Sequence, residues 1–535
     1  MARIGQEPRQ RVPRTALEAL ASSVERNSDK TALVGSGARM TFRELQSRSD
    51  NLASGLLAAG LRPGDTALFQ MGTIPDTVVA LFGCLKAGIV PVCTLPQHRG
   101  HEIRAISAIT KPRLHIVQAD YPSSFDLVGF AREMREEIAT LSHTMVVHGT
   151  AAEGELDFAR MVEMPRDAAI DAIRPGPHDV LMLQLSGGST GLPKVIPRLH
   201  GEYMSYVASW EHLLGLGPDD VHLWSLPLIH NAAMIYHLFP AISGGRKLVL
   251  MQRFDAREFF TLIETERVTY SGSIGPVASG ILAYDRIADH DISSLRFLTT
   301  LSGADRIEAH VGVPVMNAYG ITEGLLTCAR PTASLHARHM TVGIPASPLD
   351  EIRLLDPSGN EVPLGESGEL CFRGPSLFAA YMGGAEQMDG KLTPDGFFRT
   401  GDLMRAHLID GERHYSFEGR LKDNIDRGGE KFGTEDIEAL INQHPAVADS
   451  KVVAMPDPQY GEKACAYLIA APGAALPDVR ELGAFLSARG LANFKRPERI
   501  EAIDAFPTTR VGKLDRQALR DLIAAKLRDE LGHLS

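Results

Sequence analysis

Hydrophobic and polar positions follow two different periods along the chain. Thr41 stands three positions before Glu44, and the leucines that follow recur at helical spacing. This pattern is typical of a capped amphipathic helix. Short apolar runs at residues 180–185, 248–251 and 452–455 are instead typical of buried strands. The chain is therefore expected to contain both kinds of element.

Strand-like runs alternate with helical patterns, such as residues 255–266, over most of the chain. Alternation of this kind favours mixed sheets covered by helices, so we predict an α/β fold. With 535 residues, the chain is also too long for a single hydrophobic core. We therefore predict one large domain and one small domain.

Composition and charge exclude several classes of protein. Hydrophobic residues make up 44% of the chain and charged residues 23%, so it can bury sizeable cores. The net charge of −11 argues against a broad surface for nucleic acid or anionic membranes. The N-terminus has no apolar segment after its charges, and the most apolar stretch, residues 77–93, is interrupted by Lys86 and Pro91. We expect no secretory signal and no membrane span, hence a cytoplasmic protein.

The five cysteines give no sign of a disulfide framework or a metal site. They are odd in number, scattered, and set mostly in apolar runs: Cys84, Cys93, Cys328, Cys371 and Cys465. We expect reduced thiols within the cores.

A glycine-rich segment after the run at residues 180–185 is suited to binding phosphate. Its glycines let backbone N–H groups approach an anion closely, while its hydroxyls and Lys194 add donors and charge. The segment is not a Walker A loop, because Gly191 is followed by Leu-Pro-Lys rather than by Lys-Ser/Thr. A flexible turn is the alternative interpretation. The candidate phosphate-binding residues are Ser186, Gly187, Gly188, Ser189, Thr190, Gly191 and Lys194.

A second candidate segment lies more than three hundred residues later, where Lys513 follows a glycine at the end of Thr-Thr-Arg-Val-Gly-Lys. Two phosphate-binding segments on two domains suggest a ligand that is contacted from both sides. An enzyme that activates a carboxylic acid with ATP has this requirement, because it must bring two anions together and stabilise charge on phosphorus.

Further polar motifs stand between these segments. Tyr319, Thr322 and Glu323 offer an aromatic face, a hydroxyl and a carboxylate within five positions, and Asp402 follows a glycine, where it could accept both hydroxyls of a ribose. A second glycine-rich stretch follows at residues 427–433. Each motif alone also has a structural interpretation: Tyr319 as a core residue, for example, or Glu323 as part of a solvated turn.

In this order and spacing, the motifs resemble those of the adenylate-forming superfamily, which includes acyl-CoA synthetases, adenylation domains and firefly luciferase. The resemblance runs from about residue 41 to about residue 522. Within the superfamily, residues 184–200 and 423–431 are most similar to the stand-alone aryl-acid AMP ligases, the 2,3-dihydroxybenzoate and salicylate activators of siderophore pathways.

The resemblance implies a ligase that uses ATP and Mg²⁺. A carboxylate attacks ATP to give an acyl-adenylate and pyrophosphate, and a pantetheine thiol then takes the acyl group and releases AMP. Because no carrier domain follows Leu531, we expect the thiol in trans, from an aryl carrier protein or, as the alternative, from free coenzyme A. A homodimer is compatible with the resemblance. A nucleotide- or acid-sensing relative without turnover is the competing class, and ATP binding without pyrophosphate release would favour it.

The resemblance also implies a domain boundary and a role for each matching residue. Residues 1–419 would form the adenylation core, and residues 420–535 a mobile α+β lid that swings at Lys422. Residues 427–433 would face the pantetheine channel in a second conformation. The implied catalytic residues are Lys513, Thr322 at the α-phosphate and Glu323 at magnesium, and ATP would also contact residues 186–194, Gly303, Ala304, Tyr319 at adenine, and Asp402 with Arg420 at the ribose.

The acid substrate is expected at His230, Asn231 and Ala232, with Gly303 in the pocket floor. A buried His-Asn pair satisfied by the backbone is the alternative. The aryl-acid branch usually has an aromatic residue where this chain has Ala232. That difference argues against dihydroxybenzoate and makes an aminobenzoate, a hydroxypicolinate or a bicyclic acid credible.

Overall fold

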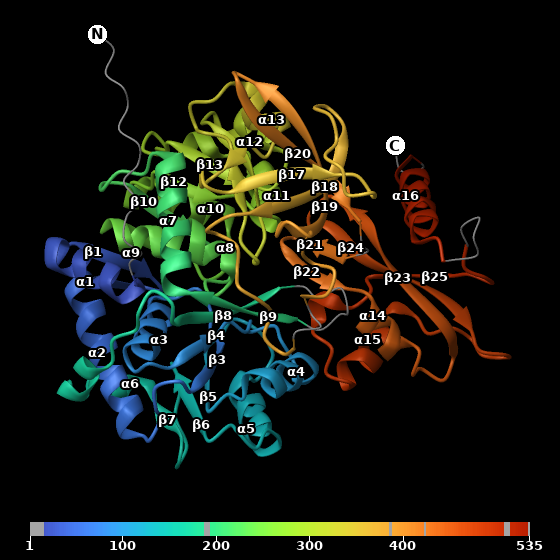
Figure 1. Cartoon of the computed structure of the whole chain (residues 1–535). Coiled ribbons are helices and arrows are strands. Elements are labelled where there is room, and N and C mark those ends of the chain that lie inside the picture. Colours follow the sequence, from blue (N-terminus) through green and yellow to red (C-terminus); the bar gives the residue numbers. More distant parts are fainter. Residues whose placement is uncertain (1–14, 187–192, 385–387, 422–423, 508–513, 533–535) are drawn as a thin grey trace, which may run out of the picture.

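The computed structural model describes residues 15–186, 193–384, 388–421, 424–507 and 514–532 of the chain. Four sheets and the helices around them form a large N-terminal domain and a smaller C-terminal domain (Figure 1). The predicted α/β class with two unequal domains is confirmed. The boundary between residues 419 and 420 stays a prediction.

A nine-stranded sheet forms one half of the large domain. Five of its neighbouring pairs are parallel, from β1 through β11, β10, β12 and β13 to β14. In spatial order the strands are β16 (Ile344–Pro345), β15 (Leu326–Cys328), β14 (Val315–Gly320), β13 (Phe297–Thr300), β12 (Tyr270–Gly272), β10 (Val221–Trp224), β11 (Lys247–Leu250), β1 (Thr31–Gly35) and β2 (Ala38–Thr41).

A seven-stranded sheet forms the other half. It is parallel except for its last pair, β8 and β9, which is antiparallel and flanks the glycine-rich segment. In spatial order its strands are β7 (Leu156–Asp157), β6 (His143–Val147), β5 (Leu114–Gln118), β3 (Thr66–Gln70), β4 (Val90–Val92), β8 (Val180–Ser186) and β9 (Lys194–Leu199).

Helices cover these two sheets, and one apolar core runs between them. The helices of the large domain are α1 (Ala16–Asn27), α2 (Phe42–Ala58), α3 (Pro75–Lys86), α4 (Gly100–Thr110), α5 (Leu127–Glu137), α6 (Phe158–Met161), α7 (His200–Leu214), α8 (Asn231–Ala233), α9 (Phe239–Gly244), α10 (Ala256–Glu266), α11 (Pro276–Leu282), α12 (Ala304–Val311) and α13 (Leu335–Met340), with a π turn at Met234–Leu238 and 3₁₀ turns at Ala168–Ala172 and Ile287–Asp289. The predicted helix after Thr41 is confirmed, and its capping box is formed.

Two smaller sheets complete the molecule. An antiparallel sheet of β17 (Glu351–Leu355), β18 (Ser367–Arg373), β19 (Phe398–Ile409) and β20 (Glu412–Arg420) closes the large domain. The C-terminal sheet comprises β22 (Glu430–Gly433), β21 (Asn424–Arg427), β24 (Gly461–Ala470), β23 (Val447–Asp457) and β25 (Arg499–Ala502), accompanied by α14 (Glu435–Ile441), α15 (Val479–Ala488), a 3₁₀ turn at Asn493–Lys495 and α16 (Arg516–Gly532). In Figure 1 this orange-to-red part lies to one side of the large domain, with α15 near α4.

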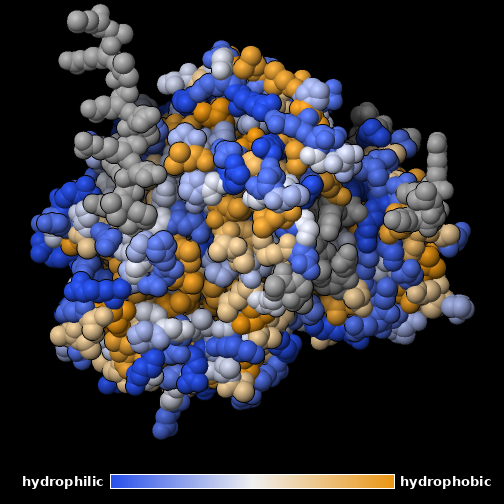
Figure 2. All heavy atoms as spheres, viewed as in Figure 1, coloured by the Kyte–Doolittle hydropathy of each residue, from blue (hydrophilic) through white to orange (hydrophobic). Residues whose placement is uncertain are grey.

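Other features of the described residues agree with the sequence. All five cysteines are buried and unpaired, as predicted. Within the described ranges, no helix is long and apolar enough to cross a membrane. In the view of Figure 2, hydrophilic residues cover most of the visible surface of the small domain, and hydrophobic residues gather toward the middle of the molecule.

A buried carboxylate links the antiparallel sheet to the loop after β18. Asp350 accepts hydrogen bonds from the hydroxyl of Ser376, at 2.7 Å, and from its backbone N–H, at 3.3 Å. Burial raises the pKa of the Asp350 carboxyl from 3.8 to about 6, although both hydrogen bonds oppose this shift. The folded chain therefore binds this proton more tightly than the unfolded chain does.

This pKa predicts a pH-dependent effect of Asp350→Asn. Because the pKa is raised on folding, the carboxyl's contribution to the free energy of unfolding falls as pH rises from about 4 to about 7. The difference in unfolding free energy, wild type minus variant, should fall by roughly 2–3 kcal/mol over that range in urea titrations. Asp285→Asn, at an exposed position, serves as the control. A difference that does not change with pH would contradict this assignment.

Candidate active site

A cavity of about 570 Å³ opens where strands of both large sheets end. Trp224, Ile274, Leu301 and Gly320 lie at or just after the carboxyl ends of parallel strands in the nine-stranded sheet, and Cys93 follows β4 in the other sheet. Ligands of open α/β sheets bind at such edges. The topology alone therefore places a ligand site here.

Most of the predicted site residues that the structure describes line this cavity. They are Ser186, Lys194, His230, Asn231, Ala232, Thr322, Glu323 and Asp402. Gly303, Ala304 and Tyr319 are not among its lining residues. Gly187, Gly188, Ser189, Thr190, Gly191, Lys422, Lys513 and the side chain of Arg420 lie outside the described residues.

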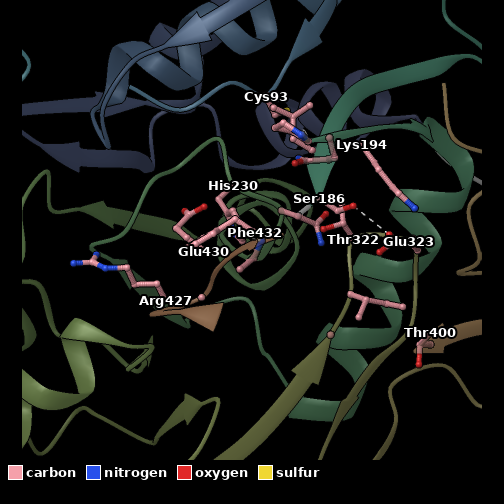
Figure 3. A pocket seen from close by; sticks show the side chains of 18 of the residues that line it. Cys93, Ser186, Lys194, His230, Thr322, Glu323, Thr400, Arg427, Glu430 and Phe432 are labelled. Carbon is pink, nitrogen blue, oxygen red and sulfur yellow. Dashed lines mark hydrogen bonds between the residues drawn. The ribbon is translucent and has the colours of Figure 1, made fainter. Parts of the chain in front are cut away.

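The turn after β14 presents a carboxylate that is held from two sides. Ser186 donates to Glu323 Oε1 at 3.2 Å, the contact drawn as a dashed line in Figure 3, and the hydroxyl of Tyr381 donates to the same oxygen at 2.7 Å. Lys194 Nζ lies 4.3 Å from the centre of the Tyr381 ring. Burial, together with the neighbouring Glu323 carboxylate, raises the pKa of Tyr381. The second carboxylate oxygen of Glu323 makes no hydrogen bond to the described chain.

The fully buried guanidinium of Arg198 stabilises this turn. Arg198 donates to the carbonyl oxygen of Thr322 and, at 3.0 Å, to that of Ser376, and it pairs with Glu202 in the first turn of α7. Burial raises the pKa of Glu202, and Arg198 opposes the shift. Three separate segments of the large domain therefore meet at Arg198.

Asp402 lies at the rim of the cavity and is bound by an aromatic hydroxyl. The hydroxyl of Tyr319 donates to Asp402 Oδ2 at 2.7 Å, and the Phe417 ring stacks on Tyr319 at 6.2 Å. Tyr319 thus fixes the position of the Asp402 carboxylate. Its predicted contact with adenine stays a prediction.

Gly303 and Ala304 form the start of α12, behind the cavity wall. Gly303 has φ of +72°, and the N–H of Ala304 donates to Asn317 Oδ1 at 3.2 Å. The amide of Asn317 in turn donates to the carbonyl of His339. These contacts stabilise the helix start, and the predicted ligand contacts of both residues stay predictions.

The inner part of the cavity contains the predicted His-Asn pair. The fully buried hydroxyl of Tyr203 donates to Asn231 Oδ1 at 2.8 Å. With its oxygen occupied in this way, the amide of Asn231 presents its Nδ2 donors to the cavity. His230 Nδ1 accepts from the N–H of Ala232 at the start of α8. Asn231 is therefore oriented by a tyrosine 28 residues earlier.

The small domain supplies the opposite wall, with Arg427, Gly428, Gly429, Glu430 and Phe432 among the lining residues. Glu430 interacts electrostatically with His230, and Figure 3 shows the two side chains near one another. Burial raises the pKa of Glu430, and His230 offsets part of the shift. The Arg427 guanidinium lies 3.9 Å from the centre of the Tyr460 ring and pairs with Glu498. The second glycine-rich stretch thus faces the cavity in this arrangement.

The two domains are also joined by a buried ion pair. Lys495 Nζ lies 3.5 Å from Glu102 Oε1, and the side chains of both residues are almost fully buried. Burial alone would raise the pKa of Glu102, but Lys495, His98 and two backbone N–H groups hold it below its usual value. Burial lowers the pKa of His98 to about 4, so this ring is neutral at neutral pH. Such a pair forms only when α4 and the small domain are in contact.

The chemistry of the Glu323 turn fits magnesium that arrives with a phosphate ligand. Within the described ranges, no group of three His, Cys, Asp or Glu side chains is arranged to hold a metal ion. Mg²⁺ commonly binds through one or two carboxylates together with substrate phosphates. The open oxygen of Glu323 can supply one such ligand.

The fold and the cavity define a two-domain enzyme whose ligands are contacted from both domains. The chain matches the family described as AMP-binding enzyme over residues 20–382, and the family described as AMP-binding enzyme C-terminal domain over residues 436–513. The protein belongs to the AMP-binding enzyme family and is an ATP-dependent ligase. The resemblance drawn from its motifs is confirmed.

Named relatives and a solved structure extend this match over almost the whole chain. Pyochelin synthase PchD of Pseudomonas aeruginosa (strain UCBPP-PA14) is 36% identical over 524 residues, 95% of this chain and 92% of the relative. A salicylyl-CoA synthase / salicylate adenylyltransferase of Streptomyces sp is 35% identical over 515 residues, 94% and 92% of the two chains. The apo structure of Mycobacterium smegmatis MbtA superposes with a TM-score of 0.69 at 31% identity, covering 95% of each chain.

Several residues that line or support the cavity carry no motif that could have identified them. Tyr203 and Tyr381 reach Asn231 and Glu323 from 28 and 58 residues away. Tyr206, Trp224 and other apolar residues of the inner wall resemble ordinary core residues in the sequence.

The contact between Tyr203 and Asn231 predicts the effect of Tyr203→Phe. Without the hydroxyl, the Asn231 amide is free to turn its oxygen toward the substrate. We expect kcat/KM for the acid to fall about 5- to 30-fold, in line with the loss of a buried hydrogen bond, while KM for ATP is unchanged. Steady-state kinetics test this, with Ser209→Ala on the same helix as the control. Equal losses for both substrates would contradict a positioning role.

Proposed function

We propose that this protein uses ATP to activate an aromatic carboxylic acid as its acyl-adenylate, and then transfers the acyl group to the pantetheine thiol of an aryl carrier protein. The observation that carries the proposal is one continuous cavity with two chemically different ends. The amide of Asn231 stands among apolar walls at one end, and Thr322 with Glu323 stands at the other. A relative named for salicylate adenylation supports an aryl acid.

Free coenzyme A is the alternative acceptor. The same relative is also named a salicylyl-CoA synthase, so similarity alone does not separate the two thiols. Both thiols carry the same pantetheine arm. Gly428, Tyr460 and Phe494 of the small domain are among the residues that line the cavity, and they are compatible with either thiol.

In the first half-reaction, a carboxylate oxygen bonds to the α-phosphorus as the bond to the β-phosphate oxygen breaks and pyrophosphate leaves. We assign Thr322 to the α-phosphate, Lys194 and the glycine-rich segment to the outer phosphates, and Asp402 with Arg420 to the ribose. Magnesium, when bound, would neutralise phosphate charge, and Glu323 would hold it. Lys513 would bridge the carboxylate and a phosphate oxygen.

In the second half-reaction, the thiol sulfur bonds to the acyl carbon, and AMP leaves with the former carboxylate oxygen. We propose that the arrangement described here serves this step. A Cβ on Gly275 would lie 2.8 Å from the carbonyl oxygen of Gly428, so the two domains approach backbone to backbone. In the first step residues 420–535 would swing about Lys422 and bring Lys513 to the cavity.

Acid-dependent ATP–pyrophosphate exchange tests the proposal. Benzoates, aminobenzoates, pyridine and quinoline carboxylates, cyclohexane carboxylate and short fatty acids form the panel. We expect at least one aryl acid to support exchange tenfold faster than any aliphatic acid does, and Glu323→Gln to lower that exchange at least tenfold. Equal or better exchange with aliphatic acids would contradict the aryl assignment, and ATP binding without exchange would favour a sensor.

Two variants should each slow a different half-reaction, one the formation of the adenylate and the other the formation of the thioester. Lys513→Ala should nearly abolish adenylate formation and spare thioester formation from a supplied acyl-adenylate. Glu102→Gln removes the carboxylate that lies against Lys495 only where the domains meet as they do here, so it should spare adenylation and slow thioester formation about tenfold or more. Single-turnover assays of each step test this.

The control for Glu102→Gln is Glu137→Gln, which removes an exposed carboxylate paired with Arg104 on the same helix as Glu102. We expect this variant to leave both steps unchanged. Equal losses in both half-reactions for Lys513→Ala or for Glu102→Gln would refute the alternation of domains.

A further inference from the structure

The segment from Phe378 to Met382 is bonded at one end to the turn after β14 and at the other end to β9. The N–H of Phe378 donates to the carbonyl oxygen of Glu323 at 2.8 Å, and the N–H of Met382 donates to that of Val195 at 2.9 Å. Met382 and Val195 form an isolated antiparallel bridge. In this register Tyr381 is diagonal to the first residue of β9, a relation within reach of aromatic and long side chains. The backbone therefore brings the Tyr381 ring close to the start of β9.

The ring of Tyr381 is held by a second aromatic ring. Tyr381 is 7% exposed and packs edge-on against Phe378, with ring centres 4.7 Å apart. Phe378 packs in turn against Phe398 of β19, at 5.4 Å. Close packing of this kind leaves a buried aromatic side chain little freedom to rotate. The hydroxyl and the face of the Tyr381 ring therefore have fixed positions.

Two groups of opposite charge contact this one ring. Its hydroxyl donates to Glu323 Oε1 at 2.7 Å, and Lys194 Nζ lies 4.3 Å from the ring centre. These distances are typical of a charge-assisted hydrogen bond and of a cation–π contact. Ser186 donates to the same oxygen of Glu323 at 3.2 Å. Both donors therefore occupy one carboxylate oxygen and leave the other for a ligand.

The same contacts reach both ends of the glycine-rich segment. Ser186 ends β8 and Lys194 begins β9, and the two residues are paired across these strands. Ser186 is bonded to Glu323, and Lys194 lies on the Tyr381 ring. Tyr381 and Glu323 together thus fix the residues at which the candidate phosphate-binding segment leaves β8 and enters β9.

We infer that Tyr381 is a positioning residue for the adenylation step: its hydroxyl orients Glu323 toward magnesium, and its ring holds Lys194 toward the outer phosphates of ATP. The inference rests on the proposed function, which assigns these two partners to magnesium and phosphate. Removing a group that orients a metal ligand typically weakens metal binding about 10- to 100-fold. Without the ring, the Lys194 ammonium could also move onto the Glu323 carboxylate and occupy the oxygen that magnesium needs.

Calorimetry tests the two contacts separately and needs no turnover. The probe is an ATP analogue with a methylene bridge between the α- and β-phosphates, titrated with Mg²⁺ and with EDTA. Wild type should bind it about tenfold or more tightly with Mg²⁺. In Tyr381→Phe, which keeps the ring, this gain should fall to about threefold or less, with affinity in EDTA unchanged. In Tyr381→Leu, affinity in EDTA should also fall about three- to tenfold, because the cation–π contact is lost.

The dependence of ATP–pyrophosphate exchange on Mg²⁺ gives a second readout. Tyr381→Phe should raise the Mg²⁺ concentration for half-maximal rate about tenfold, and excess Mg²⁺ should restore most of the rate. Tyr284→Phe is the matched control, because its hydroxyl bonds His290 and Tyr284 is not among the residues that line the cavity. We expect this control to match wild type in both measurements.

The outcomes distinguish this inference from the proposed function. Exchange with an aryl acid, combined with a Tyr381→Phe variant that keeps the full gain from Mg²⁺, would overturn the inference and leave the proposed function standing. A loss of the gain in that variant, with no exchange for any aryl acid, would support the inference and overturn the aryl-acid assignment alone. Equal affinity with Mg²⁺ and with EDTA in wild type would overturn both the inference and the assignment of Glu323 to magnesium.

Discussion

The site depends on the hydrogen bonds and the ion pair that the guanidinium of Arg198 makes. It is fully buried on β9, so its donors must be satisfied by the protein. The carbonyl oxygens of Thr322 and Ser376 accept from it, and Glu202 balances its charge. One side chain therefore joins the seven-stranded sheet to the turn that follows β14 and to the antiparallel sheet. The position of Glu323 follows from this, because the carbonyl before it is fixed.

One wall of the cavity belongs to the core of the large domain, and the opposite wall belongs to the small domain, which moves in the proposed alternation. The acid end is made from α7, the π turn and Asn231, all within the core of the large domain. The opposite wall is made from β21, β22 and the loops of the small domain, which contact the large domain through a buried ion pair and two facing glycines. A buried ion pair contributes little net stability but strongly favours one geometry once formed. The proposed alternation of domains relies on that property.

The sequence predicts more of the elements than of the contacts. The capping box at Thr41 and the apolar runs of β8, β11 and β23 follow from local rules, and the structure has these elements. Thr322, Glu323 and Asn231 were assigned to one site by motif, and they share one cavity. Tyr203, Tyr381 and Arg198 were missed, because their roles arise from tertiary contacts that leave no local pattern. Tyr319 shows the converse case, since its aromatic motif predicts a ligand contact while its hydroxyl bonds Asp402.

A crystal structure with the sulfamoyl-adenosine analogue of the acyl-adenylate of the preferred aryl acid would test the central claim most directly. The account predicts the aryl ring among Trp224, Ile235 and Tyr236, an acceptor atom of the aryl-acyl group within hydrogen-bonding distance of Asn231 Nδ2, and the ribose hydroxyls at Asp402. An aryl ring bound at the rim beside Tyr460, with Asn231 out of reach, would contradict the account.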